Sequence, residues 1–585
     1  MGAVENIITD NLPIWSSAIQ SKSSAGRGTN TKRNLYGVKK LRELILDLAV
    51  RGLLVPQDPN DEPASVLLEK IAAEKKRLVN EGAIRKGKKS SSNYEDIEPY
   101  CLIPSAWRWV ELSEIGHDWG QKKPDREFSY IDVGSINKDQ GKIQTLNSLL
   151  PQNAPSRARK IVRENTVIYS TVRPYLLNIA VIKENIHPEP IASTAFAIIH
   201  PFCKISSDYV YYYLRSKIFT KYVESYQTGT SYPAINDKNF FAGLIPLPPL
   251  AEQHRIVAKV DELMALCDTL EQQQEDSIQA HETLVEVLLE ALSNAVDADA
   301  FQAAWGSISE HFDSLFTTEH SINKLKETIL RLAVMGKLVS QDPSDEPASV
   351  LLEKIAAEKE RLVKEGEIKK HKVTPIHESE HPFILPPGWK WQRLISLTKL
   401  ITKGSSPKWQ GVSYSENTDD VLFVTSENVD SFKLKFIKKK YVEIKFNEIE
   451  PRSVLKRNDI LMNIVGASIG RTAVFDIDTL ANINQAVCLI RTLGNFLSGN
   501  FLLIFFNSEV CKNYMFDKQV DNARANLSMG NISNFVLPIP PLAEQHRIVA
   551  KVDELMALCD QLRSSLQQAQ ETQIQLTDAV VENAL

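Results

Sequence analysis

Two histidines occur in an identical local sequence, and histidine is the side chain that most often acts as a general acid or base. They lie in Gln253-His254-Arg255 and Gln545-His546-Arg547. No nucleophile or metal pattern surrounds either one, so contact with a partner, or structuring of a domain boundary, is favoured over catalysis. His371, His377 and His381 lie in a polar segment without a cysteine, which predicts no metal site.

A phosphate-binding loop is the second catalytic pattern to consider. Gly82–Lys88 reads GAIRKGK, but position 89 is lysine where the loop needs serine or threonine. The preceding residues have helical periodicity, and a second copy of this stretch has His371 in place of Gly87. The sequence also contains no glycine-rich cofactor loop after a strand and no Asn-Pro-Pro-Tyr/Phe motif for amino-methyl transfer. These patterns together predict a protein without catalytic activity of its own.

Internal repetition is the dominant feature of the chain. Residues 248–268 read PPLAEQHRIVAKVDELMALCD, and residues 540–560 repeat them without a change. Upstream, residues 57–86 and 341–370 differ at five of thirty positions. Between the repeats lie two different stretches, variable segment 1 (residues 104–247) and variable segment 2 (residues 386–539). Such alternation predicts one scaffold used twice to hold two different domains.

Charge divides along the same boundaries. Variable segment 1 holds 17 Lys+Arg against 13 Asp+Glu, and variable segment 2 holds 19 against 14. Their net charges of +4 and +5 leave −14 for the rest of a chain whose total is −5. This distribution favours anionic partners for the variable segments and protein partners for the scaffold.

The repeated segments have helical periodicity. Leu41–Leu54 matches Leu325–Leu338, and SVLLEKIAAEK follows in each copy. The identical repeat carries one apolar stripe, at Val257, Val260, Met264, Cys267 and Leu270 and again at Val549, Val552, Met556, Cys559 and Leu562. Because the chain must return between two helices with the same stripe, we expect them to pack as an antiparallel coiled coil.

The variable segments alternate short β-rich runs with Gly, Pro and Asn. An aromatic helix follows in each, at Asp208–Tyr226 and Asn500–Asp517. This pattern predicts a mixed α/β domain in each copy. Tyr211-Tyr212-Tyr213 is matched by Ile504-Phe505-Phe506, which favours helix packing over base stacking. Lys438-Lys439-Lys440 is interpreted as a solvated or phosphate-facing strand end rather than a base reader.

The cysteines and the N-terminus indicate a cytoplasmic protein. The six cysteines show no CxxC pairing, which favours buried free thiols. The first residues, MGAVENIITD, lack the blocks of a signal peptide. No run approaches the roughly 18 apolar residues that a membrane span requires.

Several of these motifs occur together in one known family. They are PLPPLAEQHRIV at Pro246–Val257 with its match at Pro538–Val549, the turn-rich stretches Gln227–Asn239 and Gln519–Asn531, and Gly466–Thr472 (GASIGRT). Over nearly its whole length, the chain resembles the specificity subunit of Type I restriction-modification enzymes.

The resemblance implies an α+β architecture, in which two mixed α/β target-recognition domains are joined by repeated long helices in an antiparallel, pseudo-twofold coiled coil. The implied domains are 1–97 (helical repeat), 98–247 (first target-recognition domain), 248–384 (central helical region), 385–539 (second target-recognition domain) and 540–585 (C-terminal helix). The implied partners are double-stranded DNA, two modification (methyltransferase) subunits and restriction (ATP-dependent translocase/nuclease) subunits. S-adenosylmethionine, ATP and Mg²⁺ would be used by those subunits, and no cofactor by this chain.

The resemblance also implies that each domain recognises half of a bipartite site, through polar side chains on loops. The candidates in the first domain are Lys122, Lys123, Arg126, Thr171, Arg173, Tyr175, Thr228, Thr230, Ser231, Tyr232 and Asn236. Those in the second are Lys403, Ser405, Lys408, Trp409, Asn463, Ser468, Arg471, Asn522, Arg524, Asn526 and Ser528. A helix of 21 residues spans about 32 Å, which is close to the roughly 34 Å turn of duplex DNA.

Two other interpretations remain open at this stage. One is a specificity half fused to its own catalytic domain, which the missing enzyme motifs disfavour. The other is a stand-alone bipartite DNA-binding adaptor or repressor, which would bind DNA tightly without partner subunits.

Overall fold

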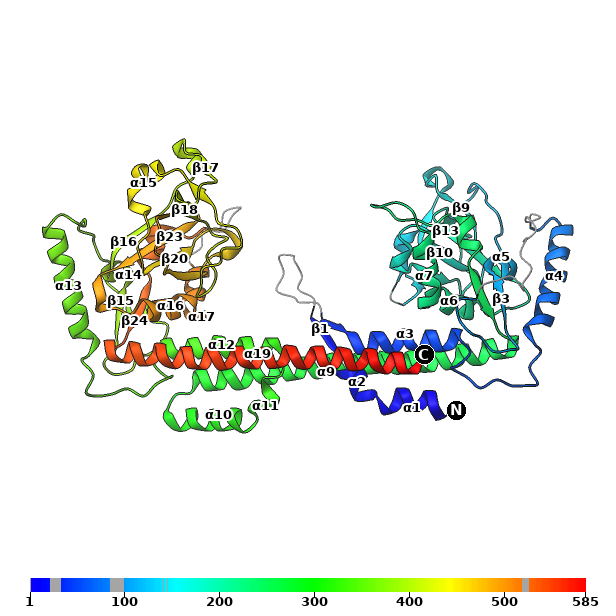
Figure 1. The fold of residues 1–585 in the computed structure, drawn as a ribbon, viewed down its shortest axis with the longest axis horizontal. Helices are drawn as coiled ribbons and strands as arrows, with labels where there is room; N and C mark the ends of the chain where they lie inside the picture. Colours follow the sequence, from blue (N-terminus) through cyan, green and yellow to red (C-terminus); the bar gives the residue numbers. More distant parts are fainter. Residues whose placement is uncertain (1, 22–32, 85–98, 139, 145, 518–525) are drawn as a thin grey trace. The chain divides into compact units, whose positions relative to one another are not determined.

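The structure, a computed structural model, describes residues 2–21, 33–84, 99–138, 140–144, 146–517 and 526–585 (Figure 1). The chain forms two compact units. Unit 1 comprises Met1–Ser277 with Gln568–Leu585, and unit 2 comprises Ile278–Gln567. Each unit therefore contains one variable segment and one copy of the repeated scaffold.

Among the described residues, the scaffold of unit 1 consists of helices and an antiparallel pair of short strands. Its elements are α1 (Gly2–Asp10), α2 (Leu12–Ser17), β1 (Ile19–Ser21), β2 (Arg33–Leu35), α3 (Tyr36–Val50), α4 (Ala64–Asn80) and the first part of α9 (Leu250–Asn294). The last turns of α19 (Leu542–Ala584) complete it. The scaffold of unit 2 has α10 (Ala298–Glu310), α11 (Phe312–Leu315), α12 (Glu319–Val334) and α13 (Ala348–Lys364), with the remaining parts of α9 and α19.

Variable segment 1 contains two four-stranded sheets. One has the order β11 (Ile179–Val181), β10 (Val167–Ser170), β13 (Phe196–Pro201), β4 (Gly116–His117), and the other β8 (Asn147–Leu149), β5 (Phe128–Ile131), β12 (Pro190–Ser193), β9 (Ala158–Ile161). Two strand pairs, β14 (Leu244–Leu247) with β3 (Arg108–Glu111) and β6 (Ile136–Asn137) with β7 (Lys142–Ile143), and four helices, α5 (Leu112–Ile115), α6 (Ser207–Arg215), α7 (Lys217–Tyr226) and α8 (Asp237–Phe241), complete it.

Variable segment 2 repeats this frame. Its sheets have the orders β16 (Thr398–Lys403), β23 (Val487–Thr492), β20 (Asp459–Asn463), β21 (Thr472–Phe475) and β17 (Tyr414–Ser415), β19 (Tyr441–Val442), β18 (Val421–Val424), β22 (Ala481–Ile483). The pair β15 (Lys390–Arg393) with β24 (Val536–Ile539) and the helices α14 (Leu394–Leu397), α15 (Lys445–Ile449), α16 (Gly499–Asn507), α17 (Glu509–Asp517) and α18 (Met529–Ser533) complete it. The predicted fold class, two mixed α/β domains on repeated long helices, is confirmed.

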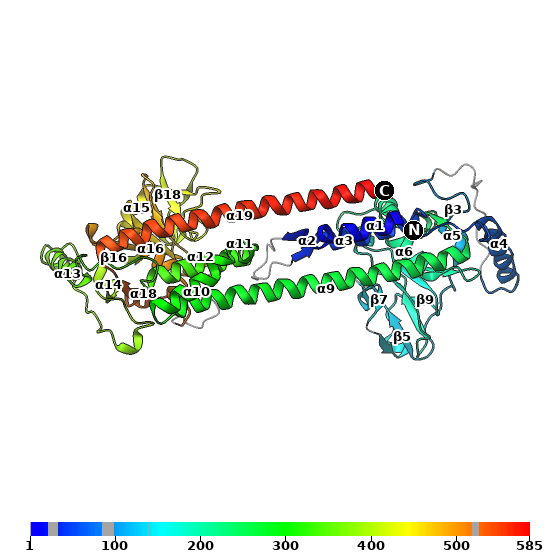
Figure 2. The ribbon, with the colours of Figure 1, turned by 90° about the horizontal axis from the view of Figure 1, so that it is seen from below.

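The second copy of the apolar stripe packs inside unit 2. Val552 and Cys559 of α19 share a core with Ile322 and Ile329 of α12 and Leu289 of α9. Figure 2 shows α12 between the C-terminal part of α9 and the N-terminal part of α19. The sequence predicted that the two apolar stripes would pack against each other. In the structure the short helix α12 covers the second stripe instead.

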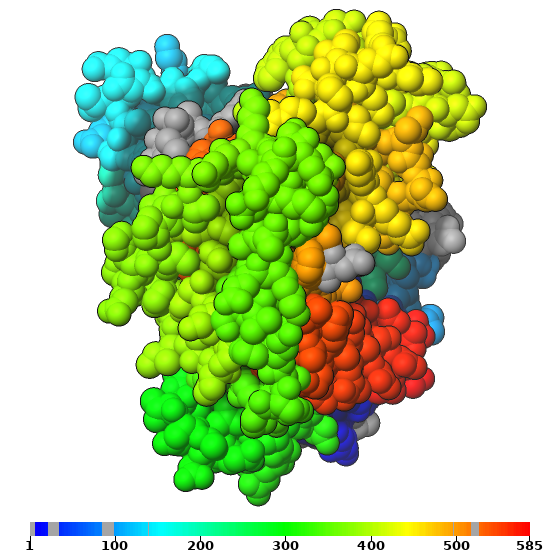
Figure 3. All heavy atoms as spheres, turned by 90° about the vertical axis from the view of Figure 1, so that its left-hand side faces the viewer, coloured from blue at the N-terminus to red at the C-terminus, as the bar shows by residue number. Residues whose placement is uncertain are grey.

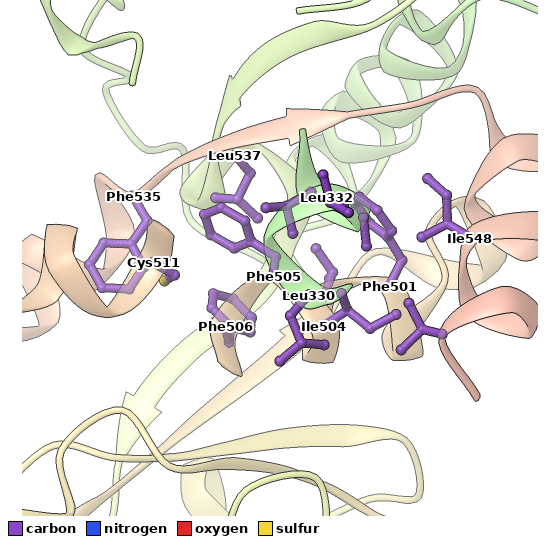
Figure 4. Packing of buried hydrophobic residues seen from close by; sticks show 14 of the residues in the cluster. Leu330, Leu332, Phe501, Ile504, Phe505, Phe506, Cys511, Phe535, Leu537 and Ile548 are labelled. Atoms are coloured by element: carbon purple, nitrogen blue, oxygen red, sulfur yellow. The ribbon is translucent and has the colours of Figure 1, made fainter. Parts of the chain in front are cut away.

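The same core extends into variable segment 2. Leu330 and Leu332 of α12 meet Phe501 and Phe505 of α16, with Ile548 of α19 beside them (Figure 4). A fully buried leucine or phenylalanine contributes about 1.5–3 kcal/mol to folding. The aromatic helix therefore anchors the domain to its scaffold.

In unit 1, polar contacts join α3 to the two long helices beside a buried apolar core that includes Leu41, Leu44 and Val260. Arg42 of α3 donates to Asp268 (2.6 Å) and Glu271 (2.8 Å) of α9. At the far end of α3, the hydroxyl of Tyr36 donates to the carboxylate of Asp578 at 2.8 Å, and Lys40 pairs with the same carboxylate at 3.1 Å. Residues from both ends of the sequence thus close one unit.

Several smaller predictions can be compared with the fold. Tyr213 is fully buried and its hydroxyl donates to the carbonyl of Leu244, so helix packing rather than base stacking is confirmed for this residue. All six cysteines are unpaired, and four of them are buried, whereas Cys101 and Cys203 are half-buried. In the part of the chain that the structure describes, no helix is long and apolar enough to span a membrane.

Candidate nucleic-acid interface

Two loops of variable segment 1 lie side by side and bring predicted contact residues together. Val172 and Thr228 each form a β-bridge with Ala234, and the Arg173 amide donates to the carbonyl of Pro233 at 2.7 Å. The guanidinium carbon of Arg173 lies 4.5 Å from the centre of the Tyr232 ring. Loop pair 1, residues 171–177 with 227–236, therefore gathers Arg173, Tyr175, Thr228, Thr230, Ser231 and Tyr232, all exposed except the half-buried Arg173.

The backbone of Arg173 has a left-handed conformation, with φ of 49°. Side chains with a Cβ rarely adopt this region, which costs roughly 1–2 kcal/mol per residue. Such conformations cluster at sites where the surrounding structure and function require them. The loop thus holds the Arg173 side chain over Tyr232 at some cost in folding free energy.

Variable segment 2 contains the equivalent pair of loops. The bridge between Val465 and Asn526 corresponds to that between Val172 and Ala234. Gly466, with φ of 75°, follows Val465 as Arg173 follows Val172. Loop pair 2, residues 463–471 with 526–528, therefore has the same backbone frame with different side chains. Ser468, Arg471, Asn526 and Ser528 belong to it, whereas Asn522 and Arg524 lie outside the described residues.

Two predicted contact residues are buried, and their assignment is corrected. The Asn463 side chain is 0% exposed and its amide donates to the carbonyls of Ser426 (2.9 Å) and Val429 (3.1 Å). Thr171 is 8% exposed and its hydroxyl donates to the carbonyl of Ala195 at 2.9 Å. Both side chains use their hydrogen-bonding groups to hold loops in place, so neither faces DNA.

Two further candidates cap helices. The Asn236 side chain accepts the Asn239 amide at the start of α8, and Ser528 accepts the Asn531 amide at the start of α18. Side chains at helix N-caps satisfy backbone donors that the helix leaves free. Both residues remain exposed at the edge of their loop pair.

Two basic candidates of variable segment 1 pair with one carboxylate. Lys122 and Arg126 pair with Glu189 at 2.5 and 3.2 Å. The hydrogen bond from Lys122, followed by that from Arg126, outweighs burial and lowers the pKa of Glu189. Lys123 is exposed beside them. Lys122, Lys123 and Arg126 outnumber Glu189, so these four residues together have a net positive charge. They lie apart from loop pair 1 in the sequence.

The corresponding part of variable segment 2 exposes an aromatic ring. The Trp409 side chain is 73% exposed, with Lys403 and Lys408 exposed near it in sequence. Ser405 accepts a hydrogen bond from the amide of Gln410 at 3.0 Å. An exposed indole among lysines suits contact with nucleic acid.

The repeated Glu-Gln-His-Arg motif locks each variable segment to its scaffold. Glu252 is buried and accepts from the indole of Trp107 (2.9 Å) and the amide of Gln57 (2.5 Å). Gln253 accepts the amide of Ser206, and Arg255 pairs with Asp61 at 2.6 Å. Structuring of the domain boundary, favoured from the sequence, is what Glu252, Gln253 and Arg255 do. His254 is exposed.

Unit 2 repeats this lock with closely similar geometry. Glu544 accepts from Trp389 (2.9 Å) and Gln341 (3.1 Å), and Arg547 pairs with Asp345 at 2.6 Å. Burial raises the pKa of both Glu252 and Glu544, although the hydrogen bonds that they accept act in the opposite direction. Two different domains are thus held by one unchanged set of contacts.

A duplicated scaffold that holds two domains of one fold, with different side chains on equivalent loops, defines a protein that presents two distinct recognition surfaces. A family model described as "Type I restriction modification DNA specificity domain" matches residues 104–280 and 391–571. The chain belongs to this family, and it is a non-catalytic DNA specificity subunit with two target-recognition domains.

Relatives agree with this assignment, and a solved structure shares the fold. The chain is 36% identical over 613 residues to the Type I restriction enzyme EcoAI specificity subunit of Escherichia coli, and 38% identical over 606 residues to the EcoEI specificity subunit of the same species. Each alignment covers 100% of both chains. A structure described as the structural basis of complex assembly and conformational transition of the type I R-M system contains a similarly folded chain. Its TM-score is 0.52 at 24% identity, over 83% of this chain and 99% of that one.

Proposed function

We propose that each variable segment recognises one half of an asymmetric, bipartite site in double-stranded DNA, and that its loop pair forms the centre of the contact surface. The observation that carries this proposal is the repeated backbone frame of the two loop pairs. Because Arg173 and Gly466 occupy equivalent positions, the frame is shared whereas the hydrogen-bonding groups differ. Base edges in the major groove are distinguished by such groups.

The proposed contacts are the exposed and half-buried candidates. They are Lys122, Lys123, Arg126, Arg173, Tyr175, Thr228, Thr230, Ser231, Tyr232 and Asn236 in variable segment 1. In variable segment 2 they are Lys403, Ser405, Lys408, Trp409, Ser468, Arg471, Asn526 and Ser528, with Asn522 and Arg524 proposed from the sequence alone. Arginines on such loops can donate two hydrogen bonds to guanine.

The scaffold is proposed to dock two modification subunits, one at each copy, and restriction subunits join the assembly. The two locks at Glu252 and Glu544 support this, because a partner that meets either copy would meet the same helix in the same relation to its domain. S-adenosylmethionine, ATP and Mg²⁺ are then used by the partner subunits. The complex is proposed to act on cytoplasmic DNA. The proposed domains are 1–97, 98–247, 248–384, 385–539 and 540–585.

Methylation mapping tests the proposal directly. The full chain is expressed with its modification subunit, and methylated bases are located across the host genome. The expected result is two short motifs separated by a fixed gap. A single continuous motif would contradict the proposal that the DNA site is bipartite. Gel-shift with and without the modification subunit separates this function from a stand-alone repressor, which would bind its site tightly alone.

A further inference from the structure

One isoleucine in variable segment 2 has no packing role. The side chain of Ile437 is 100% exposed, in the stretch between β18 and β19. A single exposed apolar residue is common on protein surfaces, so exposure alone carries no argument. Its surroundings are what distinguish Ile437.

Residues 433–440, the lysine segment, read KLKFIKKK and hold five of the 19 lysines and arginines of variable segment 2. Lys435 pairs with Asp430, and Lys440 pairs with Glu427 at 3.0 Å. Lys433, Lys438 and Lys439 are exposed and form no ion pair with any residue that the structure describes. The isoleucine is therefore flanked on both sides by positive charge that the protein does not neutralise.

Variable segment 1 provides the matched comparison. The amide of Lys435 donates to the carbonyl of Asn428, and the amide of Gln144 donates to that of Ser135 in the same frame. By this correspondence Leu146, which is 39% exposed, takes the place of Ile437. Residues 142–149 read KIQTLNSL, with a single lysine. The combination of a fully exposed apolar side chain with unpaired lysines is thus specific to variable segment 2.

The lysine segment is joined to loop pair 2. Arg471 lies 3.7 Å from Asp430, the partner of Lys435. The Phe432 amide donates to the carbonyl of Thr472 at 2.9 Å, immediately after Arg471. Through these contacts the segment is held beside the proposed base-reading loop. In Figure 3 the yellow and yellow-green residues of variable segment 2, which include this segment, form an exposed surface.

We propose that the lysine segment is a second DNA-contacting element, in which Ile437 wedges into a groove between base steps while Lys433, Lys438 and Lys439 contact the flanking phosphates. Apolar wedges framed by cations partly unstack and bend duplex DNA in several architectural proteins. Protein interfaces are depleted in lysine, so the charge favours DNA over a protein partner. The inference rests on the proposed function and extends it to recognition of DNA deformability.

One consequence concerns which bases the segment prefers. Pyrimidine–purine steps unstack and kink more easily than others. Variable segment 2 therefore selects for such a step at a position that no hydrogen bond reads. Variable segment 1, which lacks the flanking lysines, has no equivalent preference.

Fluorescence and affinity measurements on the full chain, assembled with its modification subunit, test the wedge. The probe is a duplex that carries the motif returned by methylation mapping, with 2-aminopurine placed in turn at each position of the half-site of variable segment 2 and the adjoining gap. We expect enhanced fluorescence at one step, because unstacked 2-aminopurine is brighter. The I437A variant abolishes the enhancement and weakens binding about tenfold, whereas the L146A variant changes neither. Ile437 has no intramolecular packing to lose, so the variant folds.

The lysines give an independent measurement. Each phosphate contact contributes about 0.9 to the slope of log K against log salt, so the K438Q/K439Q double variant lowers the slope by about 1.8. Wild-type affinity and fluorescence in I437A would overturn the wedge, as would loss of modification-subunit binding in place of DNA binding. Failure of the wild-type complex to prefer the mapped motif over random DNA would instead overturn the proposed function.

Discussion

The indole nitrogen of Trp107 donates to the buried carboxylate of Glu252 at 2.9 Å, and Trp389 donates to Glu544 at the same distance. In each case the tryptophan that immediately precedes the first strand of a variable segment (β3 or β15) meets the first turn of a long helix. A carboxylate there also interacts favourably with the helix dipole. This hydrogen-bonded pair is therefore one of the contacts that orient each target-recognition domain on its own scaffold.

Replacing Trp107 by phenylalanine is expected to destabilise unit 1 by about 1.5–3 kcal/mol, because a hydrogen bond to a charged, buried group is lost. Trp109, two residues further on in β3, supplies the control, since its buried indole nitrogen has no hydrogen-bond partner among the described residues. The W109F variant loses ring volume but no hydrogen bond. Chemical unfolding of the two variants measures the difference, and equal losses would show that Trp107 contributes through packing alone.

The raised pKa of Glu252 makes a prediction about pH. Because the folded state binds this proton more tightly than the unfolded state, the free energy of unfolding falls as pH rises from the ordinary value of 4.5 through the folded pKa. At pH values above the folded pKa, the contribution of Glu252 to the free energy of unfolding no longer changes. Glu544 behaves alike. Melting temperatures measured across this range should therefore fall less steeply in the E252Q/E544Q variant, and an unchanged slope would mean that other groups cause it.

Arg173 can be tested with two substitutions that separate strain from recognition. Both R173A and R173G remove the guanidinium, and each should cost about 1–3 kcal/mol in binding the cognate site if the side chain reads a guanine. Only glycine relieves the left-handed backbone, so R173G should be more stable than R173A by about 1 kcal/mol. Equal weakening on cognate and random DNA would instead indicate a phosphate contact. Arg471 and Arg524 can be tested by alanine substitution in the same assay.

Exchange of a complete domain tests whether each variable segment recognises its own half-site. If residues 104–247 are replaced by the equivalent stretch of another specificity subunit, only one half of the methylated motif should change. The incoming stretch must carry a tryptophan at the position of Trp107, because its hydrogen bond to the retained Glu252 positions the domain. Methylation mapping gives the result, and a change in both halves would contradict independent recognition.

Lengthening α9 tests whether the helices set the gap between the half-sites. Helix α9 runs without interruption past Asp268, so four residues inserted there extend it by about 6 Å. The unspecific gap should widen by one or two base pairs, because base pairs are stacked about 3.4 Å apart. The original gap, retained at full affinity, would mean that the added turn loops out near Gln272–Gln274 and that the helix serves for docking alone.

The internal repeats made the architecture predictable from the sequence. Individual side-chain contacts could not be predicted in this way. An identical stripe at Val549 and Val552 required a buried partner, but periodicity cannot say which helix supplies it, and α12 does so. Asn463 and Thr171 were expected at the surface because polar residues are common in turns. In the structure both donate to backbone carbonyls, and only three-dimensional contacts reveal that competition.

The lysine segment illustrates the opposite case. Lys438-Lys439-Lys440 was interpreted as a solvated or phosphate-facing strand end, and the sequence gives no reason to separate Ile437 from other apolar residues of a β-rich domain. In the structure Ile437 lies in a bend between β18 and β19 with its side chain completely exposed. Five lysines within eight residues were the available signal.

The contact of Asp578 with Tyr36 and Lys40 also constrains the order in which the protein can be completed on the ribosome. Unit 1 begins the chain, yet it needs residues 568–585, which are translated after the whole of unit 2. At about 5–20 residues per second, the nascent N-terminal half waits tens of seconds for its last helical turns. Tyr36 and Lys40 of α3 lack their carboxylate partner meanwhile, so the half of the protein that is made first is the half that completes its contacts last.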